Sequence, residues 1–474
     1  MSCPDFPLVE ELSPPPRPED AFLRLARRPH CLWLDSAMPH ETLGRYSFLA
    51  ADPFDYLELP VDGGDCLAKL ARRMTPLASQ PLAGLPPFQG GAAGLLSYEL
   101  GRQFETLPAA AIDEFRLPAV ALGLYDVVIA WDHADGRAWI FSQGLPEVEP
   151  NARHRRAAGR LAEVRGWLGE SPSPPWHCPR GNRLPRLSPQ QLARQHAVDR
   201  HPGLTSNLSE EEYLAAVRRT IEYIYAGDVF QVNVAQRLLL PAEDDPVSLY
   251  VRLRRCNPAP FAGYFDLGDF QVVSASPERF LRVAGGHVET RPIKGTRPRS
   301  PDPEADLAAE RELLESEKDR AENVMIVDLL RNDLARVCQP ASVKVTQLCR
   351  VETYEYVKHL VSAVEGRLRL ERSPLDLVRA AFPGGSITGA PKIRAIEIIA
   401  ELEPTARGAY CGSLGYLGFD GSMDLSILIR TITAGRGWWQ IPVGGGIVAE
   451  SDPHLEYEET WHKAEGMLQA LARE

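Results

Sequence analysis

The chain has 474 residues, of which 44% are hydrophobic and 24% charged, a composition typical of a soluble globular protein of two or three domains. Its net charge of −12 argues against a broad nucleic-acid-binding surface, and no run of about 18 apolar residues indicates a membrane span. The acidic, proline-rich N-terminus lacks signal-peptide features, and none of the eight cysteines forms a C-x-x-C pair. We therefore expect a cytoplasmic protein with free thiols and no thiolate zinc site.

Residues 1–150 mix short strand-like runs with turns and are interpreted as an N-terminal subdomain. Alternation and β-branched content predict strands in CLWLDSA, GRYSFLA, AAGLLSYEL, LYDVVIAWDH and AWIFSQG. Residues 151–204 begin with a basic helix, to about residue 169, and continue with a segment rich in Pro, Ser and Arg. We interpret that segment as a linker or exposed insertion, since a short basic stretch in an acidic chain is usually a solvated face.

Residues 205–474 contain the clearest helix signals. Ser209 followed by Glu212 is a capping-box pattern, and Gly227 is a typical helix end. Strand-like runs follow at 229–240, 261–267, 271–283 and 287–293, and one long helix is predicted from about residue 302 to 337. Helices and strands come in blocks rather than in strict βαβ alternation, which favours an α+β fold.

Two pairs of carboxylates are spaced to share a helix face. Asp319 and Glu322 lie three apart in the long predicted helix, as do Glu456 and Glu459 in a second helix that Asp452 would cap. One such pair alone is most often a solvated acidic stripe. Two pairs on two helices could instead form an all-oxygen site, which suits Mg²⁺.

Other candidate residues are ambiguous when taken singly. The glycine-rich loops FPGGSITGAPKIRA and VGGGIV could present backbone N–H groups to an anion, although neither is a Walker A loop. Arg430, at the end of an apolar run, could clamp a carboxylate or simply close a surface strand, and His359 sits in apolar company as core histidines do. Lys294 follows Glu278 by 16 residues, enough for a hairpin that brings both to one cavity, but a solvated strand-end lysine is the alternative.

Taken together, the strings resemble the chorismate-utilising enzymes, which include anthranilate, aminodeoxychorismate, isochorismate and salicylate synthases. LDSA, GRYSFLA and GGAAGLLSYEL carry the resemblance in the N-terminal part. From about residue 206 onward the matching strings are YIYAGDVFQVNVAQR, SASPERFL, RPIKGTRPR, DRAENVMIVDLLRNDLARV, YEYVKHLVS, GGSITGAPKIRA, YCGSLGYLGFDGSMDLSILIR and GGGIVAESDPHLEYEETWHKA.

The resemblance implies an α+β fold of two interwoven subdomains, in which facing antiparallel sheets are flanked by helices. It makes residues 205–474 the chorismate-binding catalytic region. It also implies Mg²⁺ held by Glu322 and Glu459, supported by Asp319 and Glu456. The residues that would bind the ring carboxylate end of chorismate are Gly295, Thr296, His359 and Gly444. Those that would bind the enolpyruvyl carboxylate are Ser386, Tyr410, Arg430 and Gly446.

The resemblance also orders the possible reactions. All members expel the C4 hydroxyl of chorismate, and Glu278 matches the general acid. Gln231 stands where the water-using members carry a lysine base, and an amide cannot be that base, so ammonia is favoured. Lys294 stands where anthranilate synthases carry alanine, which is the mark of aminodeoxychorismate synthase component I. Lysine attack at C2 would then direct ammonia to C4, giving 4-amino-4-deoxychorismate for p-aminobenzoate and folate synthesis.

The chain shows no glutaminase signature, so a separate glutamine amidotransferase subunit is implied as the ammonia source. The resemblance also suggests a tryptophan pocket, made of Ser36, Arg45, Tyr46, Ser47, Pro260 and Phe261. Two alternatives remain open: anthranilate synthase component I, or a tryptophan-binding regulatory relative with a degenerate active site. Every catalytic position that can be matched is occupied, which argues against the second. The sequence leaves open whether tryptophan binds.

Overall fold

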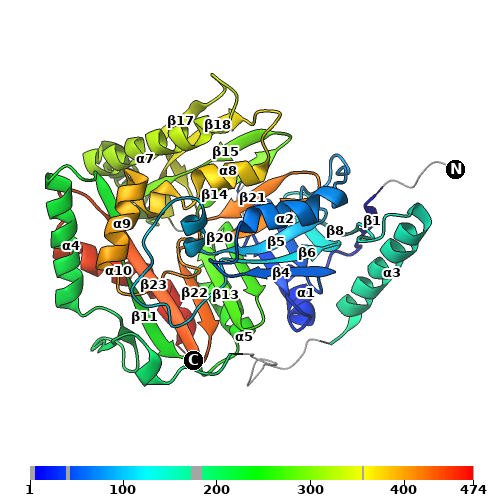
Figure 1. The fold of residues 1–474 in the computed structure, drawn as a ribbon, viewed down its shortest axis with the longest axis horizontal. Helices are drawn as coiled ribbons and strands as arrows, with labels where there is room; N and C mark the ends of the chain where they lie inside the picture. Colours follow the sequence, from blue (N-terminus) through cyan, green and yellow to red (C-terminus); the bar gives the residue numbers. More distant parts are fainter. Residues whose placement is uncertain (1–5, 39–42, 172–183, 355–356, 473–474) are drawn as a thin grey trace.

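The computed structural model describes residues 6–38, 43–171, 184–354 and 357–472 (Figure 1). Within these ranges the strands form two large antiparallel sheets with helices on their outer faces, as predicted for the α+β class. The six cysteines in these ranges are free thiols, and no helix there is long and apolar enough to cross a membrane.

The larger sheet has 13 strands in the described residues, and it draws on both halves of the chain. In spatial order they are β1 (Leu8–Glu11), β8 (Arg137–Ser142), β7 (Val127–Asp132), β3 (Tyr46–Ala50), β2 (Leu32–Asp35), β12 (Phe261–Asp266), β13 (Phe270–Ser276), β22 (Thr431–Gly435), β23 (Trp438–Ile447), β11 (Gln231–Pro241), β10 (Thr205–Ser206) and β9 (His196–Ala197), with β19 (Gly389–Ala390) also paired to β11.

The smaller sheet has 10 strands in the described residues and is also mixed in origin. In order they are β16 (Ile293–Pro298), β18 (Val357–Arg367), β15 (His287–Thr290), β14 (Arg279–Ala284), β21 (Met423–Ser426), β20 (Ser413–Gly418), β5 (Gly91–Leu96), β6 (Val120–Tyr125) and β4 (Asp55–Leu59), with β17 (Lys344–Thr353) also paired to β18.

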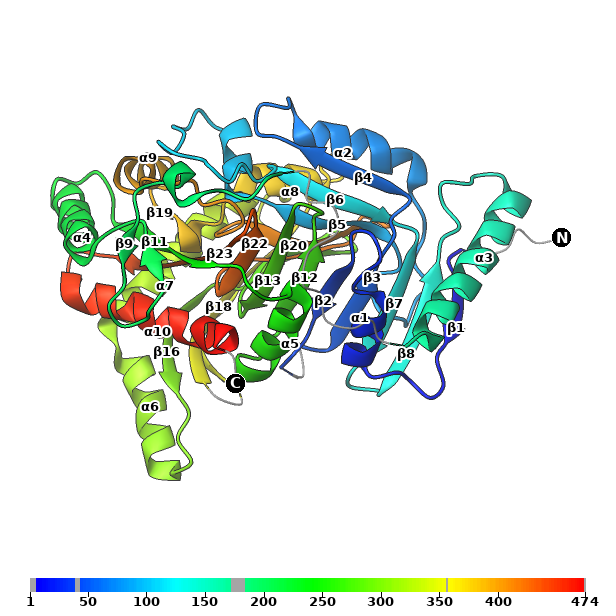
Figure 2. The same ribbon diagram turned by 90° about the horizontal axis from the view of Figure 1, so that it is seen from below.

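The helices cover the outer faces of the two sheets (Figures 1 and 2). Helices α4, α5, α9 and α10 pack on the larger sheet, α7 packs on the smaller one, and α6 projects from the body in Figure 2. The α-helices are α1 (Pro18–Leu25), α2 (Cys66–Met74), α3 (Pro150–Gly169), α4 (Glu210–Tyr225), α5 (Pro246–Cys256), α6 (Pro303–Glu315), α7 (Glu317–Ala335), α8 (Pro374–Ala381), α9 (Lys392–Leu402) and α10 (Pro453–Leu471). Short 3₁₀ turns are η1 (Thr75–Leu77), η2 (Tyr98–Gln103), η3 (Pro189–Gln191) and η4 (Gly385–Ile387).

Three apolar cores correspond to this layering. One lies between the larger sheet and its helices, and one between the smaller sheet and its helices. The third contains Phe48 and Phe265 from the larger sheet together with Leu95 and Leu414 from the smaller one, so it lies between the sheets. Burial of this apolar surface is the main term that holds the two sheets face to face.

The two halves of the chain are interwoven, as predicted. Strand β2 pairs with β12 in the larger sheet, and β5 pairs with β20 in the smaller one. Both sheets therefore run across the boundaries at residues 150 and 204 that the sequence suggested. The division of the chain into three parts at these boundaries stays a prediction.

The predicted capping residues are confirmed at the start of two helices. Ser209 caps α4 with the reciprocal capping box to Glu212, and Asp452 caps α10 by accepting from the backbone N–H groups of His454 and Leu455. The basic helix is α3, which begins at Pro150.

Three expectations were wrong in detail. The long helix predicted over 302–337 is two helices, because Ser316 has an extended backbone and caps α7 through the N–H of Asp319. The VGGGIV loop is the end of strand β23, not a loop. The second part of the predicted linker is packed: Leu187 and Ala193 are buried, and the Leu187 carbonyl accepts a hydrogen bond from the Trp438 indole. Residues 172–183 of that segment lie outside the described residues.

Candidate active site

The candidate residues lie around one cavity of about 420 Å³. It is lined by every catalytic, substrate-binding and metal-binding residue predicted from the sequence. These are Glu278, Lys294, Gly295, Thr296, Asp319, Glu322, His359, Ser386, Tyr410, Arg430, Gly444, Gly446, Glu456 and Glu459. Residues separated by up to 181 positions (459 minus 278) therefore meet in one place.

Glu278 and Arg430 lie where the chain crosses from one sheet to the other. Glu278 connects β13 of the larger sheet to β14 of the smaller one, and Arg430 connects β21 of the smaller sheet to β22 of the larger. The crossings are adjacent, because β13 pairs with β22 and β14 pairs with β21. Arg430 has a φ of 52°, a backbone conformation that costs energy in a residue with a side chain. The seam between the sheets thus places an acid and a cation side by side in the cavity wall.

The Glu278 carboxyl is tuned by burial. Its side chain is buried, and this burial raises its pKa from 4.5 to about 7, although a hydrogen bond from Ser386 and the charge of Lys294 oppose the rise. The Ser386 hydroxyl donates to Oε1 of Glu278 at 2.8 Å. A carboxyl with a pKa near neutrality can deliver a proton at neutral pH.

Lys294 lies on β16, the edge strand beside β18. The pairing slips between Lys294 and Thr296, with Gly295 in the left-handed region at a φ of 76°. A Cβ at Gly295 would lie 2.9 Å from Cγ of Asp319, so only glycine lets this strand approach α7 so closely. The Lys294 side chain lines the cavity, and its Nζ lies 3.7 Å from Oε2 of Glu322.

His359 is held as a neutral imidazole. Burial, aided by the charge of Arg430, lowers its pKa to about 4, and its Nδ1 lies 2.8 Å from the Thr296 hydroxyl. A neutral ring with a fixed hydrogen-bond partner suits recognition of a substrate oxygen better than proton exchange at neutral pH.

Four carboxylates face the cavity from two helices, and each has a cationic partner. Asp319 and Glu322 come from α7, and Glu456 and Glu459 come from α10. The pairs are Arg297–Asp319 at 3.6 Å, Lys294–Glu322 at 3.7 Å, Lys318–Glu456 at 3.3 Å and Lys463–Glu459 at 2.7 Å. Within the described ranges, no three acidic, histidine or cysteine side chains are gathered at metal-ligand spacing.

The electrostatic environments of the two central carboxylates differ. Burial raises the pKa of Glu322 above its ordinary value, against the charges of Lys294 and Lys318. Burial would also raise the pKa of Glu459, but the charge and hydrogen bond of Lys463 outweigh it and hold this pKa below its ordinary value. The negative charge of the four carboxylates is therefore largely compensated by neighbouring lysine and arginine side chains.

Comparison with known proteins shows the family of this chain. Residues 31–469 match the chorismate binding enzyme family over most of the chain. The chain belongs to this family.

Relatives with two different names are similarly close. The chain is 42% identical over 458 residues to anthranilate synthase component 1 of Streptomyces coelicolor, covering 96% of this chain and 86% of the relative. It is 40% identical over 488 residues to aminodeoxychorismate synthase component 1 of Salmonella typhimurium, covering 98% and 100%. The solved structure of anthranilate synthase component I from Streptococcus pneumoniae has a TM-score of 0.74 at 31% identity, covering 91% of this chain and 93% of that one. The chain is thus a chorismate-utilising enzyme, and overall identity does not decide between the two named reactions.

The sequence analysis missed several residues that shape this cavity. Asn233 lines it from β11, two positions after Gln231 and so on the same face of the strand. Lys318 and Lys463 line it as partners of the acidic residues, and Lys463 also donates to the Gly444 carbonyl at 2.8 Å. Lys463 lies four positions from its partner Glu459, a spacing that would have revealed this pair on the helix surface. Lys318 instead pairs with Glu456 on the other helix, which spacing could not reveal.

A separate pocket of about 100 Å³ lies at the predicted tryptophan site of this chain. Ser36, Arg45, Tyr46, Pro260 and Phe261 line it. Ser47 instead supports the pocket, because its hydroxyl accepts a hydrogen bond from the backbone N–H of Ser36 at 3.0 Å.

Proposed function

We propose that this chain is component I of an aminodeoxychorismate synthase, which converts chorismate and ammonia to 4-amino-4-deoxychorismate. The observation that carries the proposal is Lys294, an amine in the chorismate cavity beside an acid with a pKa near 7. An enzyme that only needed to admit ammonia at C2 would gain nothing from a side chain in that position.

In the first step, the neutral amine of Lys294 forms a bond to C2 of chorismate. The ring double bonds shift, the C4–O bond breaks, and Glu278 donates its proton so that the hydroxyl leaves as water. Ser386 holds the Glu278 carboxyl in place through its 2.8 Å hydrogen bond.

In the second step, ammonia attacks C4 from within the cavity. The double bonds shift back and the bond between Nζ of Lys294 and C2 breaks, which returns the lysine amine. The extra proton of the incoming nitrogen passes to the Glu278 carboxylate, so the acid is restored. The net reaction exchanges the C4 hydroxyl of chorismate for an amino group and releases water.

The charged residues around the cavity suit a dianionic substrate. Arg430, half-buried at the sheet crossing, and Tyr410 would bind the enolpyruvyl carboxylate, with the Gly446 backbone beside them. Thr296, His359, Gly295 and Gly444 would line the ring carboxylate end. Gln231, whose Nε2 lies 3.4 Å from Oε2 of Glu322, offers an amide where a water-activating base would be needed, which favours ammonia over water as the nucleophile.

The acidic residues of the cavity fit Mg²⁺. Glu322 and Glu459 supply hard carboxylate oxygens from two helices, with Asp319 and Glu456 one turn away, and Mg²⁺ takes one or two protein carboxylates together with substrate oxygens. When bound there, the ion would supply positive charge for the ring carboxylate of chorismate. The lysine partners of these carboxylates would then have to release them.

A partner subunit is part of the proposal. Relatives named component 1 support the presence of a second component, and we infer that a glutamine amidotransferase supplies the ammonia. In its absence the chain should use ammonium ions directly. We also propose that the tryptophan pocket can hold tryptophan as a structural ligand.

Anthranilate synthase component I is the second candidate, favoured by the 42% identity to the Streptomyces coelicolor relative. The deciding experiment incubates the isolated chain with chorismate, magnesium and a high concentration of ammonium at alkaline pH, and identifies the product by mass. A product that keeps the enolpyruvyl group supports the proposal. Anthranilate with released pyruvate would establish the second candidate, and absence of any aminated product would contradict both.

A further inference from the structure

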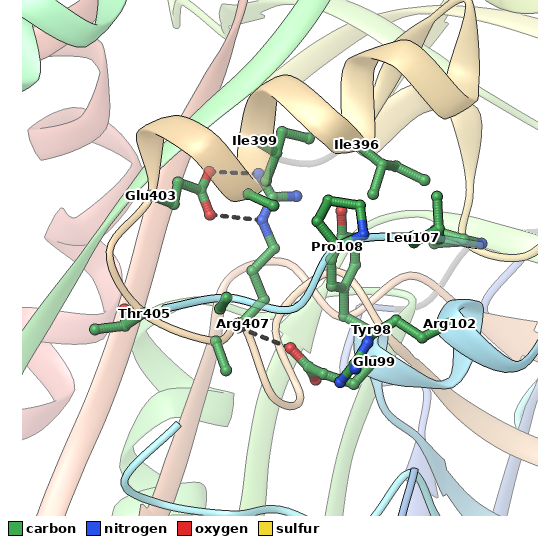
Figure 3. Close-up of a pocket in the computed structure, with 14 residues that line it drawn as sticks. Tyr98, Glu99, Arg102, Leu107, Pro108, Ile396, Ile399, Glu403, Thr405 and Arg407 are labelled. Atoms are coloured by element: carbon green, nitrogen blue, oxygen red, sulfur yellow. Dashed lines mark hydrogen bonds and ion pairs between the residues drawn. The ribbon is translucent and has the colours of Figure 1, made fainter. Parts of the chain in front are cut away.

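Arg407 is a buried arginine that lies behind the active-site wall without lining the cavity itself. It lines instead a small pocket of about 40 Å³ with Tyr98, Glu99 and Glu403 (Figure 3). Its backbone N–H donates to Oε1 of Glu99 at 3.0 Å. This pocket does not suggest a role for Arg407 in the reaction. The hydrogen bonds of its guanidinium do.

Every nitrogen of that guanidinium is used in a hydrogen bond. Nε donates to Oε2 of Glu403 at 2.8 Å, and Nη2 donates to Oε1 at 2.6 Å, which makes a bidentate ion pair. Both side chains are almost completely buried, at 3% and 6% exposure. A buried pair of this kind is by itself weak evidence of a stabilising role, because desolvation offsets the attraction.

The remaining bonds of Arg407 reach the cavity wall. Nη1 donates to the Ile387 carbonyl at 3.0 Å, and Nη2 also donates to the Asn233 carbonyl at 2.8 Å. Ile387 and Asn233 both line the chorismate cavity, as does Tyr410, whose ring centroid lies 5.7 Å from the guanidinium carbon. One planar group thus ties together three wall residues from three different parts of the chain.

The Ile387 contact leads directly to the acid. Ile387 is the last residue of η4, and its neighbour Ser386 is the residue that donates to Glu278. The position of η4 therefore sets where the Ser386 hydroxyl, and with it the Glu278 carboxyl, can lie. Among the described residues, no other arginine donates hydrogen bonds to both η4 and β11.

We propose that Arg407 is a positioning residue for the reaction: its guanidinium fixes η4 and β11 so that Ser386 holds Glu278 in the geometry of proton donation. The assignment of Glu278 as the acid rests on the proposed function. A planar group with several donors is needed, because one ammonium cannot meet Glu403, Ile387 and Asn233 in this fixed arrangement.

The chain offers a matched control. Arg237 forms a similarly buried pair with Glu114, at 2.5 Å and with 5% and 6% exposure, and it does not line the chorismate cavity. Arg407→Lys should cost at least as much thermal stability as Arg237→Lys, because Arg407 also donates to the Ile387 and Asn233 carbonyls. We expect Arg407→Lys to lower kcat for chorismate consumption roughly tenfold, since small misplacements of reacting groups have large effects, and Arg237→Lys to stay within about twofold.

A double-mutant cycle with Ser386→Ala separates positioning from general weakening. If Arg407 acts through Ser386, the loss of kcat caused by Ser386→Ala should be clearly smaller in the Arg407→Lys background than in the unmodified chain. In the Arg237→Lys background it should keep its full size. An undiminished loss in both backgrounds, or equal kcat for the two arginine variants, would overturn the proposal.

Two further points keep the result interpretable. If Arg407→Lys does not fold, Glu403→Gln leaves Arg407 in place with a neutral partner and should give the same non-additivity with Ser386→Ala, whereas additivity there would overturn the proposal. Chorismate consumption is measured whichever product forms. An error in the proposed product would therefore appear in the mass analysis and leave this comparison unaffected.

Discussion

Nζ of Lys294 lies 3.7 Å from Oε2 of Glu322, and both side chains are nearly buried, at 13% and 12% exposure. The contact joins the proposed nucleophile to one of the proposed metal ligands. While this contact is kept, the Glu322 carboxylate engages the amine that the proposed reaction uses as its nucleophile. The proposed reaction would therefore require Glu322 to be engaged elsewhere, which would link occupation of the acidic site to release of the amine.

This linkage predicts that Glu322→Gln and Glu459→Gln abolish turnover. Each removes a hard oxygen ligand of the proposed Mg²⁺ site, and a metal chelator in excess should do the same. Steady-state assays with titrated magnesium provide the measurement. Glu458→Gln is the control, because Glu458 lies on the same helix but is 43% exposed and pairs with Arg200. Full activity with excess chelator would contradict the metal assignment.

A second prediction concerns pH. Burial raises the pKa of Glu278 from 4.5 to about 7, so the carboxyl keeps its proton below about pH 7 and loses it above. Because the acid acts in its protonated form, kcat/KM should have a limb that falls as pH rises through about 7. Glu278→Gln should remove this limb and lower the rate by about 10²–10⁴.

Ser386→Ala provides an independent check on that limb. The Ser386 hydroxyl stabilises the ionised carboxyl and lowers its pKa, so its removal should move the limb to higher pH. A limb that is unchanged in both Ser386→Ala and Glu278→Gln would show that another group controls it.

A third prediction tests the packing at Gly446. A Cβ there would lie 2.0 Å from Nε2 of Gln231 and 3.5 Å from Nζ of Lys294. The close contact is with the end of a flexible side chain, so Gly446→Ala should fold but displace the Gln231 amide and lose most of its turnover. Gly159→Ala in α3, where no atom lies within 4 Å, should leave activity unchanged. Unimpaired turnover in Gly446→Ala would show that the Gln231 position is immaterial.

A fourth prediction is purely structural. Ser209→Ala removes the side-chain acceptor for the N–H of Glu212 at the start of α4 and should cost about 1 kcal/mol of unfolding free energy. Urea denaturation measures this, with Ser209→Thr expected to retain most of the stability. Since α4 contributes no residue to the cavity lining, kcat should not change; a large loss of kcat in folded Ser209→Ala would contradict that separation.

Local chemistry made parts of the fold predictable from the sequence. The capping box at Ser209 and the cap at Asp452 depend on hydrogen bonds between residues two or three apart, so the sequence alone contains the information. The break at Ser316 was missed because the flanking residues all favour helix, and only the extended backbone at this position interrupts the pattern. The Gly444–Gly446 segment was taken for a loop because glycine usually marks turns. Here a Cβ at Gly444 would lie 2.5 Å from the Val234 carbonyl oxygen, so glycine serves close strand packing in the sheet instead.

The candidate site was predictable through resemblance rather than through local pattern. Arg430 and Glu278 meet only because β13, β14, β21 and β22 carry the chain across both sheets, a long-range relationship that no periodicity encodes. Of the cationic partners, Lys463 was predictable from its four-residue spacing to Glu459, whereas Lys318 pairs with Glu456 across two helices, a contact that the local sequence does not encode. Arg407 was missed because its partners lie up to 308 residues distant in the chain.

The central claim is that the Lys294 amine covers C2 and so directs ammonia to C4. The most direct test is mass identification of the products that Lys294→Ala and Lys294→Arg make from chorismate and ammonium. We expect Lys294→Ala to lose much of its 4-amino-4-deoxychorismate and to form some C2-aminated product, including anthranilate. Lys294→Arg should be nearly inactive, because arginine keeps the charge but cannot act as this nucleophile at neutral pH. A Lys294→Arg chain with full activity, or a Lys294→Ala chain that still makes only the 4-amino product at the original rate, would contradict the claim.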